Sequence, residues 1–310
     1  MACHAPRGAR DIDARCRHHI DVRRPRGRRL AVTGVLTLPA PAKLNLFLHV
    51  LGRRPDGYHE LQTLFRLIDL CDEVHLTLNA SGTVTLADDS DGPRHDNLAV
   101  RAAQRLLERM GRRQGVAIRL RKRIPQGGLG GGSSDAASVL LGLNKLLDAA
   151  LPVAALAAIG ATLGADVPVF VRGHSAWGEG IGDRLTPVTL PEDWYVIVAP
   201  GCEVSTAAVF AHPALTRNSP VSTMRDFFGH RVRNDCEALV RGLYPAVDAV
   251  LVWLSRHGRA RLTGSGGCGF VQVAGQPEAL ALVAEVPSAW RAWAARGVDR
   301  SPIFAALEAP

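Results

Sequence analysis

The sequence predicts an α+β fold with two domains, and three observations lead to that prediction. The chain has 310 residues, a length that suits two modest domains or one large domain with an ample core. Hydrophobic residues make up 47% of it and charged residues 21%, as in an ordinary globular protein. Strand-like and helix-like segments are intermixed without the strict alternation that builds a doubly wound sheet.

The first domain is expected to span residues 35–188 and to begin with strands. Residues 35–51 are predicted to be a strand because Leu44, Leu46 and Leu48 alternate with other side chains. Asn97 lies where it can cap a helix that ends near Met110. The other elements expected here are strands at 61–70 and 73–78, a loop at 88–93, a strand-like stretch before Pro125, a helix opened by Ser133 and Ser134, a helix at 153–163, a tight connection at 164–168 and a glycine-rich segment at 173–182.

The second domain is expected to span residues 189–310, because the pattern starts again after Pro191. Residues 194–199 are apolar and predict a buried strand. Short strands at 261–263 and 269–273 flank a second small-residue turn, Gly264-Ser265-Gly266-Gly267. Helices are expected at 221–228, 235–243, 246–256 and 277–285.

The net charge of +8 is concentrated at the start of the chain. Residues 1–30 contain nine arginines and three aspartates, so they carry +6 and the rest of the chain only +2. A nearly neutral body gives no support to nucleic-acid binding. The head lacks the apolar core of a secretory signal, and its aspartates argue against a transit peptide. We expect residues 1–34 to be a disordered basic extension, or the result of a start codon assigned too far upstream.

Two features argue against a membrane-spanning or disulfide-stapled protein. No apolar run approaches the ~20 residues that a bilayer-spanning helix needs. The six cysteines, at 3, 16, 71, 202, 236 and 268, include no Cys-x-x-Cys pair, which argues against a zinc site and a disulfide scaffold. A reducing, cytoplasmic compartment is therefore expected.

The most informative segment is the glycine run that begins at Pro125. Five of its first eight residues are glycine, and an apolar helix pattern follows at once. Such a backbone turns tightly and can bring several N–H groups to one anion, and the positive end of the helix favours phosphate. A flexible linker is the alternative, but the strand before the run and the helix after it favour a phosphate cradle. No Gly-Lys-Ser/Thr closes the run, so it is not a Walker loop.

Three polar positions stand out beside this run. Lys43 and Asn45 lie two residues apart on one face of a predicted strand, although such a face is often merely solvated. Asp166 stands among apolar residues, where a carboxylate is costly unless it is paired or used. It can be a catalytic base near a cation, or it can cap the local turn.

Tyr58 and His59 follow a turn at Asp56-Gly57. The phenol ring can stack on a planar base and the imidazole can hydrogen-bond its edge. The alternative is a capped turn with a partly buried tyrosine. No cluster of His, Cys, Asp or Glu has metal-ligand spacing, and the turn at 264–267 is explained equally well by a tight hairpin.

Six motifs, in order, resemble those of the GHMP kinases, the galacto-, homoserine, mevalonate and phosphomevalonate kinases. The resemblance extends from Leu38 to the C-terminus and is strongest to members whose substrate carries a diphosphocytidyl group. It implies an N-terminal domain like ribosomal protein S5 domain 2 and a ferredoxin-like C-terminal domain. The motifs are Pro-Ala-Lys-Leu-Asn-Leu (41–46), Asp-Gly-Tyr-His-Glu-Leu (56–61), Asp-Asn-Leu (96–98), Gly-Leu-Gly-Gly-Gly-Ser-Ser-Asp-Ala-Ala (128–137), Leu-Gly-Ala-Asp-Val-Pro-Val-Phe (163–170) and Leu-Thr-Gly-Ser-Gly (262–266).

The resemblance implies transfer of the γ-phosphoryl group of ATP to the 2-hydroxyl of a diphosphocytidyl-methylerythritol, in the non-mevalonate route to isoprenoids. Asp166 matches the aspartate that accepts the hydroxyl proton, and Lys43 the lysine that orients it and neutralises charge in the transition state. Mg²⁺ is expected with ATP, without assigned ligands.

The same resemblance implies the binding residues. Tyr58 and His59 match positions that hold the cytosine, and Asn45 and Thr206 match positions that contact the substrate. The ATP phosphates are expected against Pro125, Gln126, Gly127, Gly128, Leu129, Gly130, Gly131, Gly132, Ser133 and Ser134.

The chain departs from the family pattern in three places. Only three residues separate Pro125 from Leu129, where the family usually has four, so reduced ATP affinity is the first defect to expect. Gly269 stands where a branched residue is common. The leading 34 or so residues have no counterpart.

Three other functions stay open at this point. The chain can be a GHMP kinase for an alcohol without a nucleotide, although such a site has no need of the Tyr58-His59 pair. It can be a non-catalytic ligand sensor, against which Lys43 and Asp166 both argue. A basic RNA-binding protein would depend on the head alone.

Overall fold

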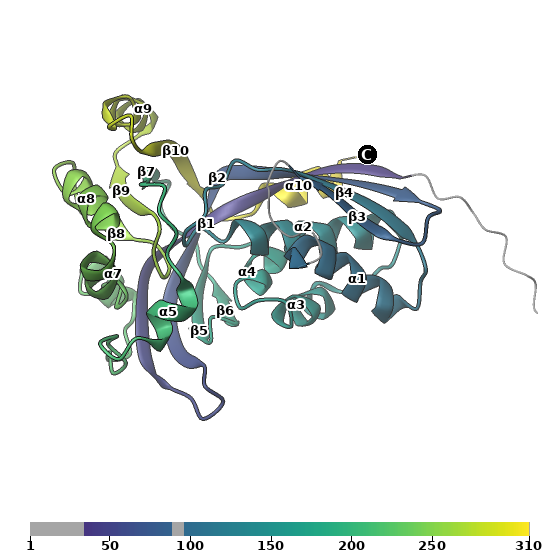
Figure 1. Cartoon of the computed structure of the whole chain (residues 1–310), viewed down its shortest axis with the longest axis horizontal. Coiled ribbons are helices and arrows are strands. Elements are labelled where there is room, and N and C mark those ends of the chain that lie inside the picture. The colour runs from purple at the N-terminus through teal and green to yellow at the C-terminus, as the bar shows by residue number, and fades with distance from the viewer. Residues whose placement is uncertain (1–33, 89–95, 310) are drawn as a thin grey trace, which may run out of the picture. The chain divides into compact units, whose positions relative to one another are not determined.

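The computed structural model describes residues 34–88 and 96–309. Residues 1–33 of the predicted basic extension and residues 89–93 of the predicted loop lie outside the described residues. Strands and helices are intermixed along the chain, so the predicted α+β class is confirmed (Figure 1).

A long antiparallel pair of strands forms the frame of the fold. β1 (Val35–Arg53) pairs with β2 (His59–Asn79) along its whole length. The prediction of two separate strands at 61–70 and 73–78 is wrong, because β2 is continuous. Its register shifts where Pro41 faces Cys71 and Ala42 faces Ile68, so Asp69 and Leu70 of β2 bulge next to the break that was expected at residues 71–72.

The two ends of β2 have different partners. Its second half pairs with β4 (Gly115–Arg121), which pairs in parallel with β3 (Val84–Asp88). Residues 61–65 of β2 pair instead with β5 (Ala176–Gly180), whose other neighbour is β6 (Arg184–Pro187). The start of β2 is thereby held beside the connection between β5 and β6.

Helices pack against this sheet around one large core. α2 (Gly131–Leu146) contacts β1, β2 and α1 (Leu98–Met110). Asn97 caps α1 as predicted, with its side chain accepting from the N–H of Ala99 at 2.9 Å. α3 (Val153–Ala161) was also predicted, but α4 (Val167–Arg172) replaces the end of the expected connection at 164–168.

A second group of strands continues the sheet. β7 (Trp194–Ala199), β8 (Arg261–Leu262), β9 (Gly269–Val273) and β10 (Arg291–Val298) follow the order β8-β9-β7-β10, and β10 also pairs with β2. α8 (Pro245–Leu254) packs on β7 and β9, and α9 (Gln276–Glu285) packs on β7 and β10. α7 (Glu237–Leu243) contacts α8.

Several short elements of the second half were not predicted. They are β10, α5 (Thr206–Ala211) and α10 (Pro302–Glu308). The helix expected at 221–228 begins later, as α6 (Met224–Phe228), because Thr223 and Asp226 form a capping box there. α10 returns to pack against β1. The boundary between the two domains, expected near residue 188, stays a prediction.

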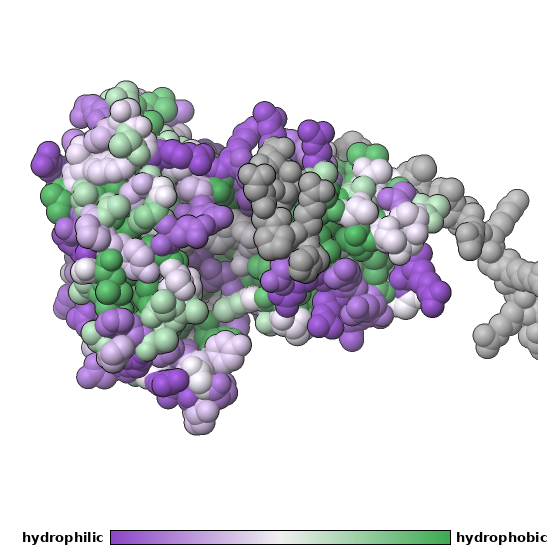
Figure 2. All heavy atoms as spheres, in the orientation of Figure 1, coloured by the Kyte–Doolittle hydropathy of each residue, from purple (hydrophilic) through white to green (hydrophobic). Residues whose placement is uncertain are grey.

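The surface of the described chain carries both polar and apolar side chains. Figure 2 shows hydrophilic residues spread over one face between smaller hydrophobic areas. No helix within 34–88 and 96–309 has the length and apolar character to cross a membrane.

Candidate active site

Lys43 and Asp166 meet in the structure although 123 positions separate them. The Nζ of Lys43 lies 3.2 Å from Oδ2 of Asp166. The lysine side chain is 3% exposed and the carboxylate 34%, so the ammonium is buried behind an accessible acid. Because the carboxylate of Asp166 is accessible, a substrate group can still approach it within the ion pair.

The position of Lys43 is fixed on several sides. Its backbone N–H donates to the carbonyl of Leu129 at 3.0 Å, so β1 is tied to the glycine loop. Its Nζ also donates to Oδ1 of Asn45 and lies 5.5 Å from the centre of the Phe65 ring. The expectation that Lys43 and Asn45 share one face of the strand agrees with this contact.

Asp166 does not cap the helix that follows it. It stands at the N-terminal boundary of α4, but its side chain makes no capping hydrogen bond there. The carboxylate is directed to Lys43 instead. Of the two interpretations left open by the sequence, the geometry favours a carboxylate held near a cation.

The glycine loop needs its glycines for conformation and for space. Gly127, Gly128 and Gly130 have φ values of +114°, +78° and +74°, which L-residues with a side chain rarely adopt. A Cβ on Gly130 would lie 2.8 Å from the Phe170 ring. The loop therefore approaches its surroundings by backbone alone, as a phosphate cradle requires.

The predicted serine cap of the helix after this loop is wrong. α2 begins at Gly131, with Gly130 in the left-handed conformation before it, so Ser133 and Ser134 lie inside its first turns. Ser134 is fully buried and its Oγ has no partner among the described residues, whereas Ser133 lines a cavity. The first N–H groups of a helix have no intrahelical acceptors, and a glycine offers no side chain to cap them. This N-terminus is suited to an anion.

The second glycine turn supports the first. Residues 264–267 connect β8 and β9, as expected for a tight hairpin, but they also touch the loop. A Cβ on Gly127 would lie 2.6 Å from the Cα of Gly267, so the two backbones are stacked. Oγ1 of Thr263 donates to the carbonyl of Gly128 and accepts from the N–H of Asn45, both at 3.1 Å.

One cavity of about 350 Å³ gathers most of the polar site. Strands, the glycine loop, α5 and the second glycine turn contribute to its wall. The hydroxyls of Thr206 and Ser265 hydrogen-bond each other there at 2.6 Å. The predicted site residues that line it are Lys43, Asn45, Gly128, Gly130, Ser133, Asp166 and Thr206.

The remaining loop residues lie beside this cavity rather than in its wall. Gln126 and Gly127 line a neighbouring pocket of about 360 Å³, which also includes Gly128 and Thr206. Leu129 is buried and anchors Lys43 through its carbonyl. Pro125 precedes the glycines, and Gly131 and Gly132 are the first two residues of α2.

Tyr58 and His59 lie outside both pockets. Tyr58 is 59% exposed in a turn closed by Asp56, which accepts its N–H at 3.1 Å. His59 begins β2, and its ring centre lies 5.3 Å from that of Phe210, which does line the cavity. His59 is thus connected to the cavity through an aromatic neighbour, whereas Tyr58 faces solvent.

A buried ion cluster fixes both ends of the glycine loop. Lys122, before the loop, pairs with Asp72 of β2 and with Asp135 of α2, after the loop. Asp72 also accepts the N–H of Ile124 at 2.8 Å. Burial alone would lower the pKa of the Lys122 ammonium, but the two carboxylates outweigh it and raise that pKa. The loop is therefore held between two charged anchors.

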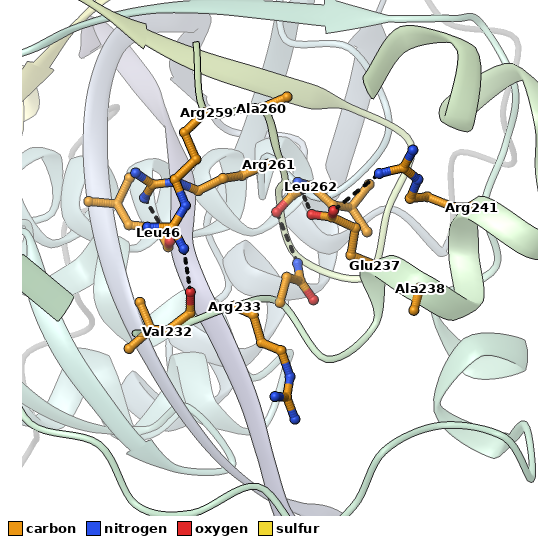
Figure 3. Close-up of a pocket in the computed structure, with 11 residues that line it drawn as sticks. Leu46, Val232, Arg233, Glu237, Ala238, Arg241, Arg259, Ala260, Arg261 and Leu262 are labelled. Carbon is orange, nitrogen blue, oxygen red and sulfur yellow. Dashed lines mark hydrogen bonds and ion pairs between the residues drawn. The ribbon is translucent and has the colours of Figure 1, made fainter. Parts of the chain in front are cut away.

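A further pocket belongs to the frame of the fold. Figure 3 shows this pocket, of about 470 Å³, with Arg259 and Arg261 directed towards backbone carbonyls. Arg261 donates to the carbonyl of Leu46 at 3.0 Å, and Arg259 to that of Val232 at 2.8 Å. None of the predicted site residues lines it. Arg261 thus holds β8 against β1, next to the second glycine turn, whereas Arg259 ties the chain before β8 to Val232.

Residues 34–88 and 96–309 contain no group of three or more His, Cys, Asp or Glu side chains that could hold a metal ion. The acidic group in the cavity wall is Asp166, and Ser133 adds a hydroxyl. Oxygen groups of this kind suit Mg²⁺ when phosphate oxygens and water complete its shell.

Sequence reasoning missed five residues of the cavity region. Thr263 and Ser265 lie in the motif Leu-Thr-Gly-Ser-Gly (262–266), whose sequence alone indicates no role for their hydroxyls. Thr63, Phe65 and Phe210 carried no local signal, because only long-range pairing brings them to Lys43, Asn45 and His59.

Two family models match this chain, one to each half. The model of the GHMP kinase N-terminal domain matches residues 97–174, and that of the C-terminal domain matches residues 212–292. Together with the fold, they define the class of the protein: the chain belongs to the GHMP kinases.

Its relatives within this class share one name. Proteins named 4-diphosphocytidyl-2-C-methyl-D-erythritol kinase match from Chromohalobacter salexigens, with 52% identity over 88% of this chain and 94% of that protein, and from Halorhodospira halophila, with 51% identity over 87% and 95%. A crystal structure of 4-(cytidine 5'-diphospho)-2C-methyl-D-erythritol kinase superposes with a TM-score of 0.73, at 36% identity over 84% of this chain and 99% of that one. The predicted family is confirmed.

Proposed function

We propose that this protein phosphorylates the 2-hydroxyl of 4-diphosphocytidyl-2-C-methyl-D-erythritol with ATP, giving the 2-phosphate and ADP. The observation that carries the proposal is the contact of Lys43 with Asp166 in the wall of one cavity, below an uncapped helix N-terminus. A carboxylate, a buried cation and a phosphate cradle are the groups that phosphoryl transfer requires.

The proposed mechanism assigns the acid–base step to Asp166. Its accessible carboxylate accepts the proton of the substrate hydroxyl as that oxygen attacks the γ-phosphorus and ADP leaves. Lys43 neutralises charge beside the reacting oxygens and holds the carboxylate in place. Asn45 keeps the ammonium oriented, and its own amide donates to Thr63 at 2.9 Å.

The phosphates of ATP are assigned to the glycine loop and the N-terminus of α2. The left-handed glycines keep side chains out of the cradle, and the helix supplies N–H groups and the positive end of its dipole. Mg²⁺, when bound with ATP, neutralises phosphate charge. The hydroxyl of Ser133 would hold the ion together with phosphate oxygens and water, which would leave the carboxylate of Asp166 free to accept the substrate proton.

The diphosphocytidyl group is assigned to the side of the cavity formed by α5. Thr206 and Phe210 are four positions apart, so both face the cavity from one side of the helix. His59 lies outside the cavity, and its ring packs against that of Phe210. Tyr58 is exposed to solvent in this structure. Its ring can stack on the cytosine after a movement of its turn on substrate binding.

The test is transfer of phosphate from ATP to the diphosphocytidyl substrate, compared with mevalonate and homoserine under the same conditions. We expect ADP release with the first and none above background with the others. Preference for mevalonate or homoserine would favour a GHMP kinase for an alcohol without a nucleotide. ATP binding without ADP release from any of the three would favour a ligand sensor.

We propose a cytoplasmic location from the chemistry of the cysteines. Among the described residues, Cys71, Cys202, Cys236 and Cys268 are free thiols, which suit a reducing compartment.

A further inference from the structure

Two neighbouring arginines, Arg259 and Arg261, lack an acidic partner. Both line the cavity of about 470 Å³ in Figure 3, whose wall shares no residue with the cavity that contains Lys43 and Asp166. Within the described part of the chain, neither guanidinium forms an ion pair with a carboxylate; each donates to a backbone carbonyl instead. Two like charges held close together repel each other, and a counter-ion between them removes that cost.

The electrostatics of Arg261 show this repulsion. Burial and then the positive charge of Arg259 lower the pKa of its guanidinium, and Tyr195, Asp193 and Glu237 compensate only in part. A guanidinium does not lose its proton in a protein, so deprotonation cannot relieve the repulsion. An anion between the two groups would relieve it.

Most N–H groups of the two side chains have no acceptor in the described part of the chain. A guanidinium carries several N–H donors, but Arg259 uses Nη2 on the carbonyl of Val232 and Arg261 uses Nη1 on that of Leu46. Nε of Arg261 is buried without a partner among the described residues. The planar fork of a guanidinium matches the oxygens of a phosphate, so two such groups can hold one phosphate from two sides.

The other charged side chains of this wall are already paired. Nε of Arg233 lies 2.8 Å and Nε of Arg241 lies 2.6 Å from an aspartate oxygen. The acid in the wall is Glu237, which lies 3.8 Å from Arg241. Four arginines and one glutamate give the wall a net positive charge. The two arginines that lack an acid, Arg259 and Arg261, are the ones that an anion can neutralise.

A ligand can reach this arginine pair from solvent. Arg259 is exposed and Arg261 is half-buried. Both also line a neighbouring cavity of about 720 Å³, whose acid, Glu278, accepts the N–H of Ala274 at 2.8 Å. The two cavities therefore meet at the pair, and the space beside it accommodates more than a single phosphate group.

We propose that Arg259 and Arg261 bind a phosphate-bearing small molecule at a site separate from the active site. The phosphate oxygens would lie between the two guanidinium groups, where each oxygen accepts a charge-assisted hydrogen bond. A phosphate carries more charge and more acceptor oxygens than a carboxylate, so it matches two adjacent cations better. The organic part of a phosphate ester has apolar neighbours in the same wall, among them Leu46, Val232 and Leu262. This inference goes beyond the proposed function and does not depend on it.

The first test uses the unchanged protein and pyrophosphate as the probe. Phenylglyoxal modifies accessible arginines, and mass spectrometry of the digested protein gives the rate at each position. At constant ionic strength, pyrophosphate should slow the modification of Arg259 by at least about tenfold, because charge-assisted contacts then cover its guanidinium. Arg256, which is exposed and lines neither cavity, should react at an unchanged rate.

This measurement is specific to the arginine pair. Pyrophosphate bound at the glycine loop would leave Arg259 uncovered, because the loop and the pair line different cavities. Equal rates at Arg259 with and without pyrophosphate would overturn the inference. Protection of Arg259 and Arg256 to the same degree would also overturn it, since that result indicates general attraction to a basic surface.

The second test is calorimetric titration of variants with pyrophosphate at constant ionic strength. Arg259→Met should weaken binding by at least about tenfold, because it removes the charge and the fork of one guanidinium. Arg259→Lys should give an intermediate affinity, since it keeps the charge alone. Arg256→Met is the matched control, because it removes the same charge from a neighbouring position and should bind like the wild type. Any binding at the glycine loop contributes equally in all four proteins.

The remaining outcomes define the ligand class. Wild-type affinity in a folded Arg259→Met protein, checked by its Tm, would overturn the inference. If that variant does not fold, Arg259→Lys and the modification rates decide the matter. Acetate that protects Arg259 as well as pyrophosphate does would contradict the assignment to phosphate. Neither test measures phosphate transfer from ATP, so failure of the proposed function would leave this inference unaffected.

Discussion

Among single residues, the pair of Lys43 and Asp166 concentrates the proposed chemistry. The ammonium is buried and the carboxylate is accessible, so the first can act on the reaction only through charge and position. The acid alone is placed to take a proton. Substitution of Lys43 and substitution of Asp166 are therefore expected to reduce catalysis in different ways.

We predict that Asp166→Asn abolishes turnover while leaving affinity for the cytidine substrate largely intact. The amide keeps the size of the side chain but accepts no proton, so kcat should fall by at least about 100-fold. Steady-state kinetics and calorimetric titration measure the two quantities. Asp248→Asn, which alters a surface carboxylate paired with Arg241, is the control. A kcat near that of the wild type would contradict the assignment.

What the sequence could predict about individual residues depended on how local their signal was. Lys43 and Asn45 stood out as two polar residues on one face of a strand, and Asp166 as a carboxylate among apolar residues; the structure brings the three together. Arg217 and Phe210 had no such signal, since their partner His59 is about 150 positions away. Side chains defined by long-range contacts could not be recognised from their neighbours in sequence.

Among the elements, the glycine loop and α2 form the most constrained unit. The loop is stacked on the second glycine turn, tied to β1 and held by the ion cluster around Lys122. Whether its shorter length lowers ATP affinity stays a prediction. A backbone fixed at so many points is expected to tolerate little change in conformation.

We predict that Gly130→Ala destabilises the protein and raises the KM for ATP. A left-handed L-residue costs roughly 1–2 kcal/mol, and the new Cβ would lie 2.8 Å from the Phe170 ring. Gly132→Ala is the matched control for stability, because its Cβ would meet only Leu98, at 3.9 Å, and alanine favours a helix. Thermal unfolding should give a lower Tm for the first variant and an equal or higher Tm for the second. Equal losses in both would refute the explanation.

Prediction of elements succeeded where the pattern was long and failed where it was short. β1, α1 and α3 carry enough periodic residues to be recognised, and Asn97 identifies the start of α1. α4 and α5 have six residues each, too few for a period to be read. The break expected in β2 is a bulge, which only pairing with β1 defines.

Considered as a whole, the molecule assembles one cavity from distant parts of the chain. Its described wall runs from Lys43 to Ser265 and draws on β1, β2, the glycine loop, α5 and the second glycine turn. The relatives match 87–88% of this chain, and the resemblance to the family begins at Leu38. The arginine-rich head before it is therefore not expected to contribute to the reaction.

We predict that deletion of residues 1–30 leaves kcat and KM unchanged for both substrates. The measurement is steady-state kinetics of the shortened protein beside the full chain. An RNA-binding role for the head would appear as salt-dependent RNA affinity that is lost on deletion. A large drop in kcat would instead place the head in the reaction.

The position of β10 has a consequence for how the protein is made. β10 lies between β2 and β7 in the sheet, yet it is formed by residues 291–298, near the end of the chain. During synthesis β2 and β7 both emerge before the strand that bridges them. A nascent chain that is almost finished, or one cut short by a premature stop before residue 291, therefore carries an unpaired edge along β7, of the kind that recruits other chains, and lacks the two pairs that join β10 to β2 at Leu67 and Ile68.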